Sequence, residues 1–86
     1  MYINIGNNVM IKDDEIVGIF DLDSATVSKR TRDYLNRAEK EKKVINIATD
    51  IPKTFVVCEK KGVKKVFLTQ PSSGTLLKRF GLTETI

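Results

Sequence analysis

The sequence contains no histidine and only one cysteine, and these two shortages exclude several kinds of chemistry. Without histidine the chain lacks the commonest general base, the Ser–His and Cys–His nucleophile pairs, and most zinc sites. The single cysteine, Cys58, permits neither an internal disulfide nor a Cys-x-x-Cys redox site. Because Cys58 lies within an apolar run, we expect a buried structural thiol in a reducing compartment.

Long hydrophobic segments are also missing. There is no secretory signal peptide and no apolar stretch of about 18 residues, so we expect a soluble, cytoplasmic protein without membrane contact. The 86 residues suffice for one small domain of modest stability, and a hydrophobic fraction of 41% argues against disorder. We predict that residues 1–81 form a single compact α+β domain and that residues 82–86 form a frayed tail.

The net charge of +4 is unevenly distributed along the chain. Residues 1–23 carry one basic and five acidic side chains, a net −4, whereas the remaining residues carry fourteen basic and six acidic, a net +8. This asymmetry suggests an acidic side and a basic side, and so either a polyanionic partner or head-to-tail self-association. A solvated surface without a partner is the alternative that charge alone leaves open.

The segment from Ile16 to Glu41 has the clearest pattern: an apolar strand, a short acidic turn and one long helix. The run 17–20 is apolar on both faces of a period-2 strand, which is typical of a central strand. Asp23 or Ser24 can cap the helix. Its apolar stripe has helical spacing and comprises Val27, Thr31, Tyr34, Leu35 and Ala38. The opposite, mainly basic face comprises Lys29, Arg32, Asn36, Lys40 and Lys43.

The rest of the chain alternates between short strands and turns. Strands are predicted over 1–6, 9–11, 44–48, 54–59 and 63–69, with turns at Gly6-Asn7-Asn8 and Lys60-Lys61-Gly62. Gly62 is expected at positive φ in a hairpin. A final helix begins at Pro71-Ser72-Ser73, where Ser72-Ser73-Gly74 is interpreted as a cap rather than as a nucleophile, and is closed by Gly81. The order predicts an α+β fold: a mostly antiparallel sheet with one long helix and a short C-terminal helix, both helices on one side.

One motif resembles an active site. Phe20-Asp21-Leu22-Asp23-Ser24 after an apolar strand is similar to the first motif of haloacid-dehalogenase-type phosphatases, in which the first carboxylate attacks phosphorus. That mechanism also needs a lysine and a second acidic pair on later strands of a much larger domain, and this chain lacks the acidic pair and the length. We therefore interpret Asp21 and Asp23 as groups that suit the helix N-terminus, and predict no catalysis.

Basic side chains are the other candidate chemistry, because phosphate contacts need only well-placed cations. They gather in three places: on the long helix (Lys29, Arg30, Arg32, Arg37 and Lys40), at the hairpin tip (Lys60, Lys61, Lys64 and Lys65) and on the last helix (Lys78-Arg79). Charged helix faces are usually solvent faces, and acidic residues interrupt this one. RNA recognition by stacking is less favoured, since the aromatic residues in strand patterns, Tyr2, Phe55 and Phe67, are expected in the core.

Several stretches together resemble a known family. The stretches YINIG, IFDLDSATVSKRTRDYL, PKTFVV and TLLKR are similar to the small bacterial extracellular-matrix (biofilm) regulatory proteins, the RemA/RemB family, and most of all to its RemB branch. The resemblance covers nearly the whole chain, and the middle stretch is the most specific. It implies a compact α+β domain, a homo-oligomeric ring and DNA binding in the transcriptional control of matrix genes.

The RemA branch looks to use arginines just before the strand at 16–20 and in the loop after the strand at 44–48. At those places this chain has Asp14-Glu15 and Asp50-Ile51-Pro52, so the arginines do not carry over. Lys53, slightly further along the loop, is the basic residue there.

The sequence thus predicts a non-enzymatic, DNA-binding transcriptional regulator of extracellular matrix (biofilm) genes that acts as a homo-oligomer. The expected partners are double-stranded DNA and other copies of the chain, with no cofactor, no metal and no small-molecule substrate. The candidate phosphate contacts are Lys53, Lys60, Lys61, Lys29, Arg30 and Arg32. The alternative is an oligomeric regulatory protein-interaction module without direct DNA contact.

Overall fold

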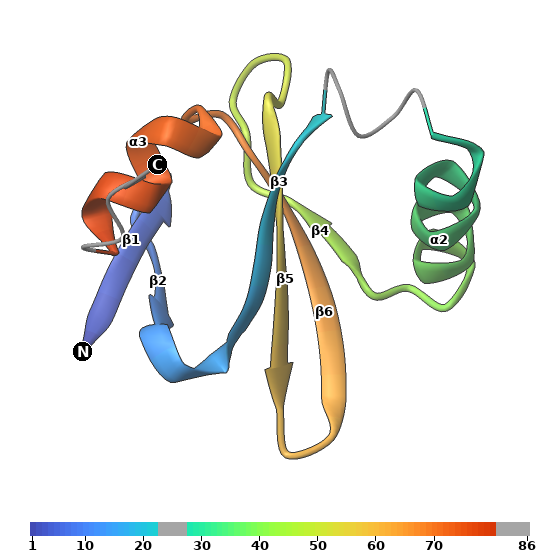
Figure 1. The fold of residues 1–86 in the computed structure, drawn as a ribbon, viewed down its shortest axis with the longest axis horizontal. Helices are drawn as coiled ribbons and strands as arrows, with labels where there is room; N and C mark the ends of the chain where they lie inside the picture. The colour runs from blue at the N-terminus through green and yellow to red at the C-terminus, as the bar shows by residue number, and fades with distance from the viewer. Residues whose placement is uncertain (23–27, 81–86) are drawn as a thin grey trace.

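A four-stranded sheet with a helix on each side dominates the computed structural model, which describes residues 1–22 and 28–80 (Figure 1). Along the chain the elements are β1 (Tyr2–Gly6), β2 (Val9–Lys12), the 3₁₀ turn η1 (Asp13–Glu15), β3 (Ile16–Asp21), α2 (Lys29–Lys40), β4 (Val44–Asn46), β5 (Thr54–Lys60), β6 (Val63–Thr69) and α3 (Ser73–Arg79). The predicted α+β class, with a longer helix and a short C-terminal one, is confirmed. Neither α2 nor α3 is long and apolar enough to cross a membrane.

The strands form two sheets. β1 and β2 make an antiparallel hairpin of their own, and the larger sheet has the order β3-β5-β6-β4. Within it β3 and β6 pair antiparallel with β5, whereas β4 pairs parallel with β6. The sheets are thus mostly antiparallel, as predicted. The turn at Asn7 and Asn8 has φ of +51° and +63°, values that asparagine tolerates better than most residues.

The prediction that the strand at 17–20 is central was wrong. β3 lies at the edge of the four-stranded sheet, and no described strand pairs with its outer side. Val17 is 59% exposed and Phe20 is 43% exposed. The buried strand is β5, in which all five residues from Thr54 to Cys58 are buried. In β3 an apolar run on both faces therefore belongs to an edge strand, in which Ile16 and Ile19 pack against the core while Val17 and Phe20 are exposed.

The two faces of the large sheet have separate cores, so the prediction that both helices lie on one side was wrong. On one face α2 packs through Ala38 against Phe55, Val57 and Val66. On the other face α3 packs through Leu76, together with the β1–β2 hairpin. That second core comprises Ile5, Ile11, Val56, Cys58 and Leu76. Because successive β5 side chains point to opposite faces, β5 contributes to both cores.

The predicted start of the long helix falls on residues that the structure does not describe, and α2 is the part that it does describe. Helix α2 starts at Lys29, after Ser28 in an extended conformation (φ −74°, ψ 128°). The capping interpretation of Asp23 and Ser24, and the place of Val27 in the apolar stripe, lie outside the described residues. In the rest of the stripe Ala38 is buried, whereas Tyr34 is 39% exposed.

The start of the C-terminal helix was predicted correctly. The predicted cap at Ser72 is confirmed, since its Oγ accepts a hydrogen bond from the N–H of Thr75 at 3.3 Å. Gly81 and the predicted tail at 82–86 lie outside the described residues.

Of the aromatic residues expected in the core, Tyr2 is exposed, whereas Phe55 is buried as predicted.

Candidate nucleic-acid interface

The β5–β6 hairpin ends in a two-residue turn that presents lysines to solvent. Lys60 pairs with Val63 at the end of the ladder, and Lys61 and Gly62 form the turn with φ of +52° and +81°. Positive φ at both turn positions suits the right-handed twist of hairpin strands. The predicted turn, with Gly62 at positive φ, is confirmed. Its tip extends beyond the other strands at the bottom of Figure 1.

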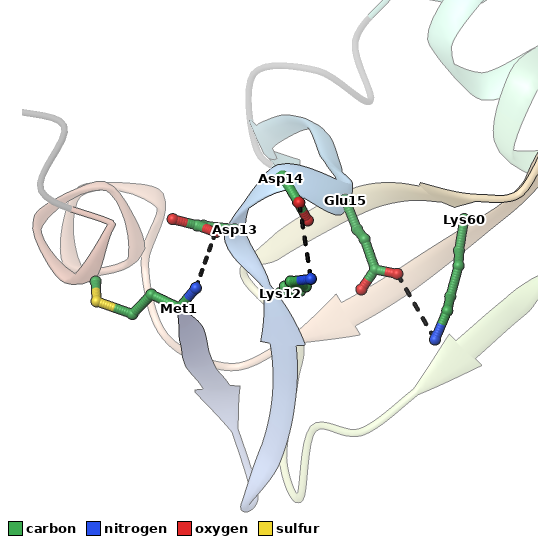
Figure 2. Close-up of polar contacts among 6 residues, drawn as sticks. All are labelled: Met1, Lys12, Asp13, Asp14, Glu15 and Lys60. Atoms are coloured by element: carbon green, nitrogen blue, oxygen red, sulfur yellow. Dashed lines mark hydrogen bonds and ion pairs between the residues drawn. The ribbon is translucent and has the colours of Figure 1, made fainter.

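Lys60 is not an isolated cation. Its Nζ lies 3.9 Å from Oε2 of Glu15, in the η1 turn before β3 (Figure 2). The side chain of Glu15 is only 20% exposed, whereas that of Lys60 is 73% exposed. An ion pair with so exposed a lysine contributes little to stability, typically below about 1 kcal/mol. Lys60 can therefore turn from Glu15 to an external anion at small cost.

Three lysines of the hairpin surround one groove on the α3 side of the sheet. Lys60, Lys61 and Lys65 line a cavity of about 420 Å³. Lys65 pairs with Cys58 across the ladder, so their side chains lie on the same face. Cys58 and Lys60 are two residues apart on β5, and strand alternation therefore places Lys60 on that face as well. The other lining residues are Met10, Ile11, Glu15, Cys58, Val63 and Phe67. Lys65 was among the basic residues expected at the hairpin tip but not among the six candidate phosphate contacts, and the structure adds it to the groove.

Lys53 lies far from this groove, at the opposite end of β5. Its N–H donates to the carbonyl of Thr69 at 2.9 Å, and its own carbonyl accepts from Leu22 N–H at 2.9 Å. These bonds fix its backbone while the side chain stays exposed. Lys53 immediately precedes β5 and Lys60 is its seventh and last residue, so the two are about 24 Å apart at the rise of an extended strand. One copy therefore cannot bring both lysines to the same phosphate.

The predicted cations of α2 are exposed but do not form one cluster. Lys29, Arg30 and Arg32 all lie in the first turn, yet Arg30 and Arg32 are two residues apart and so point to nearly opposite sides of the helix. Arg30 instead lines a groove together with Lys64 of β6, on the face of the sheet opposite to Lys65. The six predicted contacts thus lie in three regions: the loop before β5, the hairpin tip and α2, where they are further divided between two sides of the helix.

The acidic corner before β3 meets the hairpin rather than lying on a separate side. The N-terminal ammonium lies 3.4 Å from Asp13, and Lys12 lies 4.0 Å from Asp14 (Figure 2). With the Glu15–Lys60 pair, each carboxylate of η1 has a cation nearby. The charge asymmetry of the sequence is therefore partly compensated inside one copy.

Cys58 is a buried thiol, as predicted. Burial, and secondarily the nearby Glu15 carboxylate, raise the pKa of Cys58 from 9.0 to about 11. A thiol with so high a pKa stays protonated near neutral pH and is a poor nucleophile. Of the DxD motif, Asp21 is the exposed last residue of β3, while Asp23 lies outside the described residues.

Comparisons with known proteins agree with the resemblance seen in the sequence. Residues 2–80 match the model of the RemA-like family, described as extracellular matrix regulatory protein A-like. The chain is also similar to extracellular matrix regulatory protein B of Bacillus subtilis (strain 168). The two are 33% identical over 79 residues, which cover 92% of this chain and 89% of that protein.

Proposed function

The chain belongs to the RemA-like family of extracellular matrix regulatory proteins, and from this premise we propose that it regulates matrix genes by binding duplex DNA as a homo-oligomer. The regulatory role follows the description of the family and the name of the relative. This role requires no catalysis, because the proposed contacts with DNA are ion pairs to phosphates and involve no reacting group.

The observation that carries DNA binding is the lysine cluster at the tip of the β5–β6 hairpin. Lys60, Lys61 and Lys65 surround one groove, and Glu15 is the one carboxylate among its lining residues. Lysines bind phosphates as point charges and release counterions from DNA, which supplies affinity without base recognition. This arrangement supports binding that is strong at low salt and weakly dependent on sequence.

Self-association is supported by the exposed edge of the sheet. Val17 is a large apolar residue exposed on β3, a strand without a described partner on its outer side. Unpaired edges and exposed apolar residues are common features of surfaces that become buried between subunits. Each added copy would repeat the hairpin tip, so weak phosphate contacts would add up to useful affinity.

An electrophoretic shift assay tests the DNA-binding proposal. Duplex from a matrix-gene promoter and an unrelated duplex of equal length would be titrated with the protein at about 50 mM and about 200 mM salt. We expect both duplexes to be retarded at low salt, with log K falling linearly with log salt by about 0.9 per phosphate contact. No retardation of either duplex at the lower salt would contradict the proposal.

A second function, a regulatory protein-interaction module without DNA contact, is favoured by one observation. Lys60 is paired with Glu15, and the corner at 13–15 carries three carboxylates where a phosphate-binding surface would gain from cations. If the duplex titration is negative while light scattering shows an oligomer, this function replaces the first.

A further inference from the structure

A groove of about 350 Å³ lies between α2 and the face of the sheet formed by β3 and β5. Figure 1 shows α2 to the right of the sheet. Its lining residues are Val17, Phe20, Arg30, Thr31, Tyr34, Phe55, Val57 and Lys64. Most of them are apolar, and two are cationic. This composition resembles that of ligand sites, in which an apolar surface carries a few convergent polar groups.

Aromatic rings form two sides of the groove. Phe20 stacks on Phe55 with ring centroids 4.9 Å apart and an interplanar angle of 19°. Phe55 is buried beneath it, whereas Phe20 from β3 and Tyr34 from α2 are 43% and 39% exposed. Exposed flat rings are platforms for nucleobases, because every base has a π-face that can stack on them.

The charge of the groove is entirely positive. Arg30 comes from α2 and Lys64 from β6, and no carboxylate is among the eight lining residues. Lys64 lies 4.0 Å from Glu59, but both side chains are about half exposed and the pair is weak. Arg30 forms no ion pair with any carboxylate in the described parts of the chain. An arginine fork and a lysine converging on one groove suit a phosphate.

We propose that this groove binds a nucleotide, with the base against Phe20 and Tyr34 and the phosphate held by Arg30 and Lys64. The volume is at the low end of the range for ligand sites and fits a mononucleotide better than a larger ligand. The proposal goes beyond gene regulation by duplex binding and does not depend on it. The lysine cluster at Lys60, Lys61 and Lys65 lies on the opposite face of the sheet.

Calorimetric titration of the full chain tests the chemistry of the ligand. The probe is adenosine 5′-monophosphate, compared with adenosine, which lacks the phosphate, and with ribose 5-phosphate, which lacks the base. We expect the nucleotide to bind at least about tenfold more tightly than either fragment, because it alone joins stacking to charge pairing. Equal affinity for nucleotide and adenosine would overturn the phosphate assignment, and equal affinity for nucleotide and ribose 5-phosphate would overturn the stacking assignment.

Paired variants test the location. Arg30→Gln and Lys64→Gln should each weaken the nucleotide at least about fivefold, as expected when a charge-assisted hydrogen bond is removed. Arg32→Gln, on the other side of α2, and Lys65→Gln, on the other face of β6, are matched controls that should leave affinity unchanged. Equal reductions of affinity in a variant and its control would overturn the site.

Two competing occupants are distinguished by further measurements. A single-stranded (dA)₈ oligonucleotide that binds through Arg30 and Lys64 while the mononucleotide does not bind would assign the groove to nucleic acid strands and overturn the proposal. Loss of nucleotide binding at the protein concentration where light scattering shows assembly would mean that a second copy covers the groove, and would also overturn it. Binding that persists in both states supports the nucleotide site.

Discussion

The ring of Phe20 lies over the backbone of Gly18, so closely that a Cβ on Gly18 would stand 2.6 Å from Cε2 of Phe20. No real Cβ contact is that short, so any residue other than glycine at 18 must displace the ring. The ladder between β3 and β5 is also irregular here, with a register shift between Ile16 and Gly18. Such bulges bend a strand and redirect its side chains. Gly18 therefore sets the position from which Phe20 stacks on Phe55.

Gly18→Ala should separate the proposed nucleotide site from the stability of the fold. Because Phe20 is partly exposed, its ring can swing into solvent, and we expect the free energy of unfolding to change by less than about 1 kcal/mol. The affinity for adenosine 5′-monophosphate should fall at least about fivefold, since the stacking surface moves. Urea unfolding and calorimetry measure the two effects.

Gly74→Ala provides the control for this substitution. A Cβ at Gly74, in α3, would meet nothing within 4 Å, so nucleotide affinity should not change, and stability should rise by roughly 0.5–1 kcal/mol from the better helix former. Wild-type nucleotide affinity in Gly18→Ala would contradict the role assigned to Phe20.

Local structure was the part of the fold that the sequence predicted well. The turn at Lys61 and Gly62 and the cap at Ser72 depend on neighbouring residues alone, and both were found where the sequence placed them. The end of α2 was harder. Lys42 has φ of +59° and the N–H of Lys43 bonds back to the carbonyl of Ala38 at 2.9 Å, which closes the helix without the usual glycine.

The sequence did not predict which elements pack against one another in the fold. An apolar run covered by another strand and an apolar run left at an edge have the same pattern, so β3 was misplaced. The approach of Arg30 and Lys64 to one groove depends on how α2 crosses the sheet, and no spacing along the chain encodes it. The sequence shows which residues are basic, but it does not show that the fold places them in three separate regions.

Val17→Lys should weaken self-association. Val17 is exposed on the edge strand β3, and a charge placed there would have to be desolvated when a second copy covers it. Light scattering at micromolar concentration should show a mass above the 9.7 kDa of one chain for the wild type and a lower mass for the variant. Val63→Lys is the matched control, since Val63 is similarly exposed, at 53%, but lies at the hairpin tip. A wild-type protein of one-chain mass would refute the oligomer.

Alkaline pH should destabilise the protein through Cys58. Its pKa of about 11 in the folded chain exceeds the 9.0 of the free thiol, so above pH 9 the unfolded chain releases this proton before the folded chain does. Stability is therefore unaffected below pH 9 and falls as pH rises from 9 to 11, by roughly 2–3 kcal/mol at most.

The alanine variant isolates this effect from the lysines and tyrosines that also titrate at high pH. Urea unfolding of wild type and Cys58→Ala between pH 8 and 11 should show a shallower decline for the variant, even though losing a buried side chain lowers its stability at pH 8. Parallel declines would show that Cys58 ionises equally easily in both states.

The cations that bind DNA, if the proposed function holds, should be those of the hairpin tip. Neutralising Lys60 and Lys61 together as Gln should reduce the slope of log K against log salt by about 0.9 for each phosphate that these lysines neutralise in the wild-type complex.

The other candidate cations serve as comparisons. Lys53→Gln, and the double variant Lys29→Gln with Arg32→Gln, should each change the slope less. Lys53 lies at the far end of β5 from the hairpin tip, and Asp33 follows Arg32 on the helix. Electrophoretic shifts at several salt concentrations give the slopes. A larger effect from Lys53 would place the phosphates about 24 Å away, at the other end of the sheet.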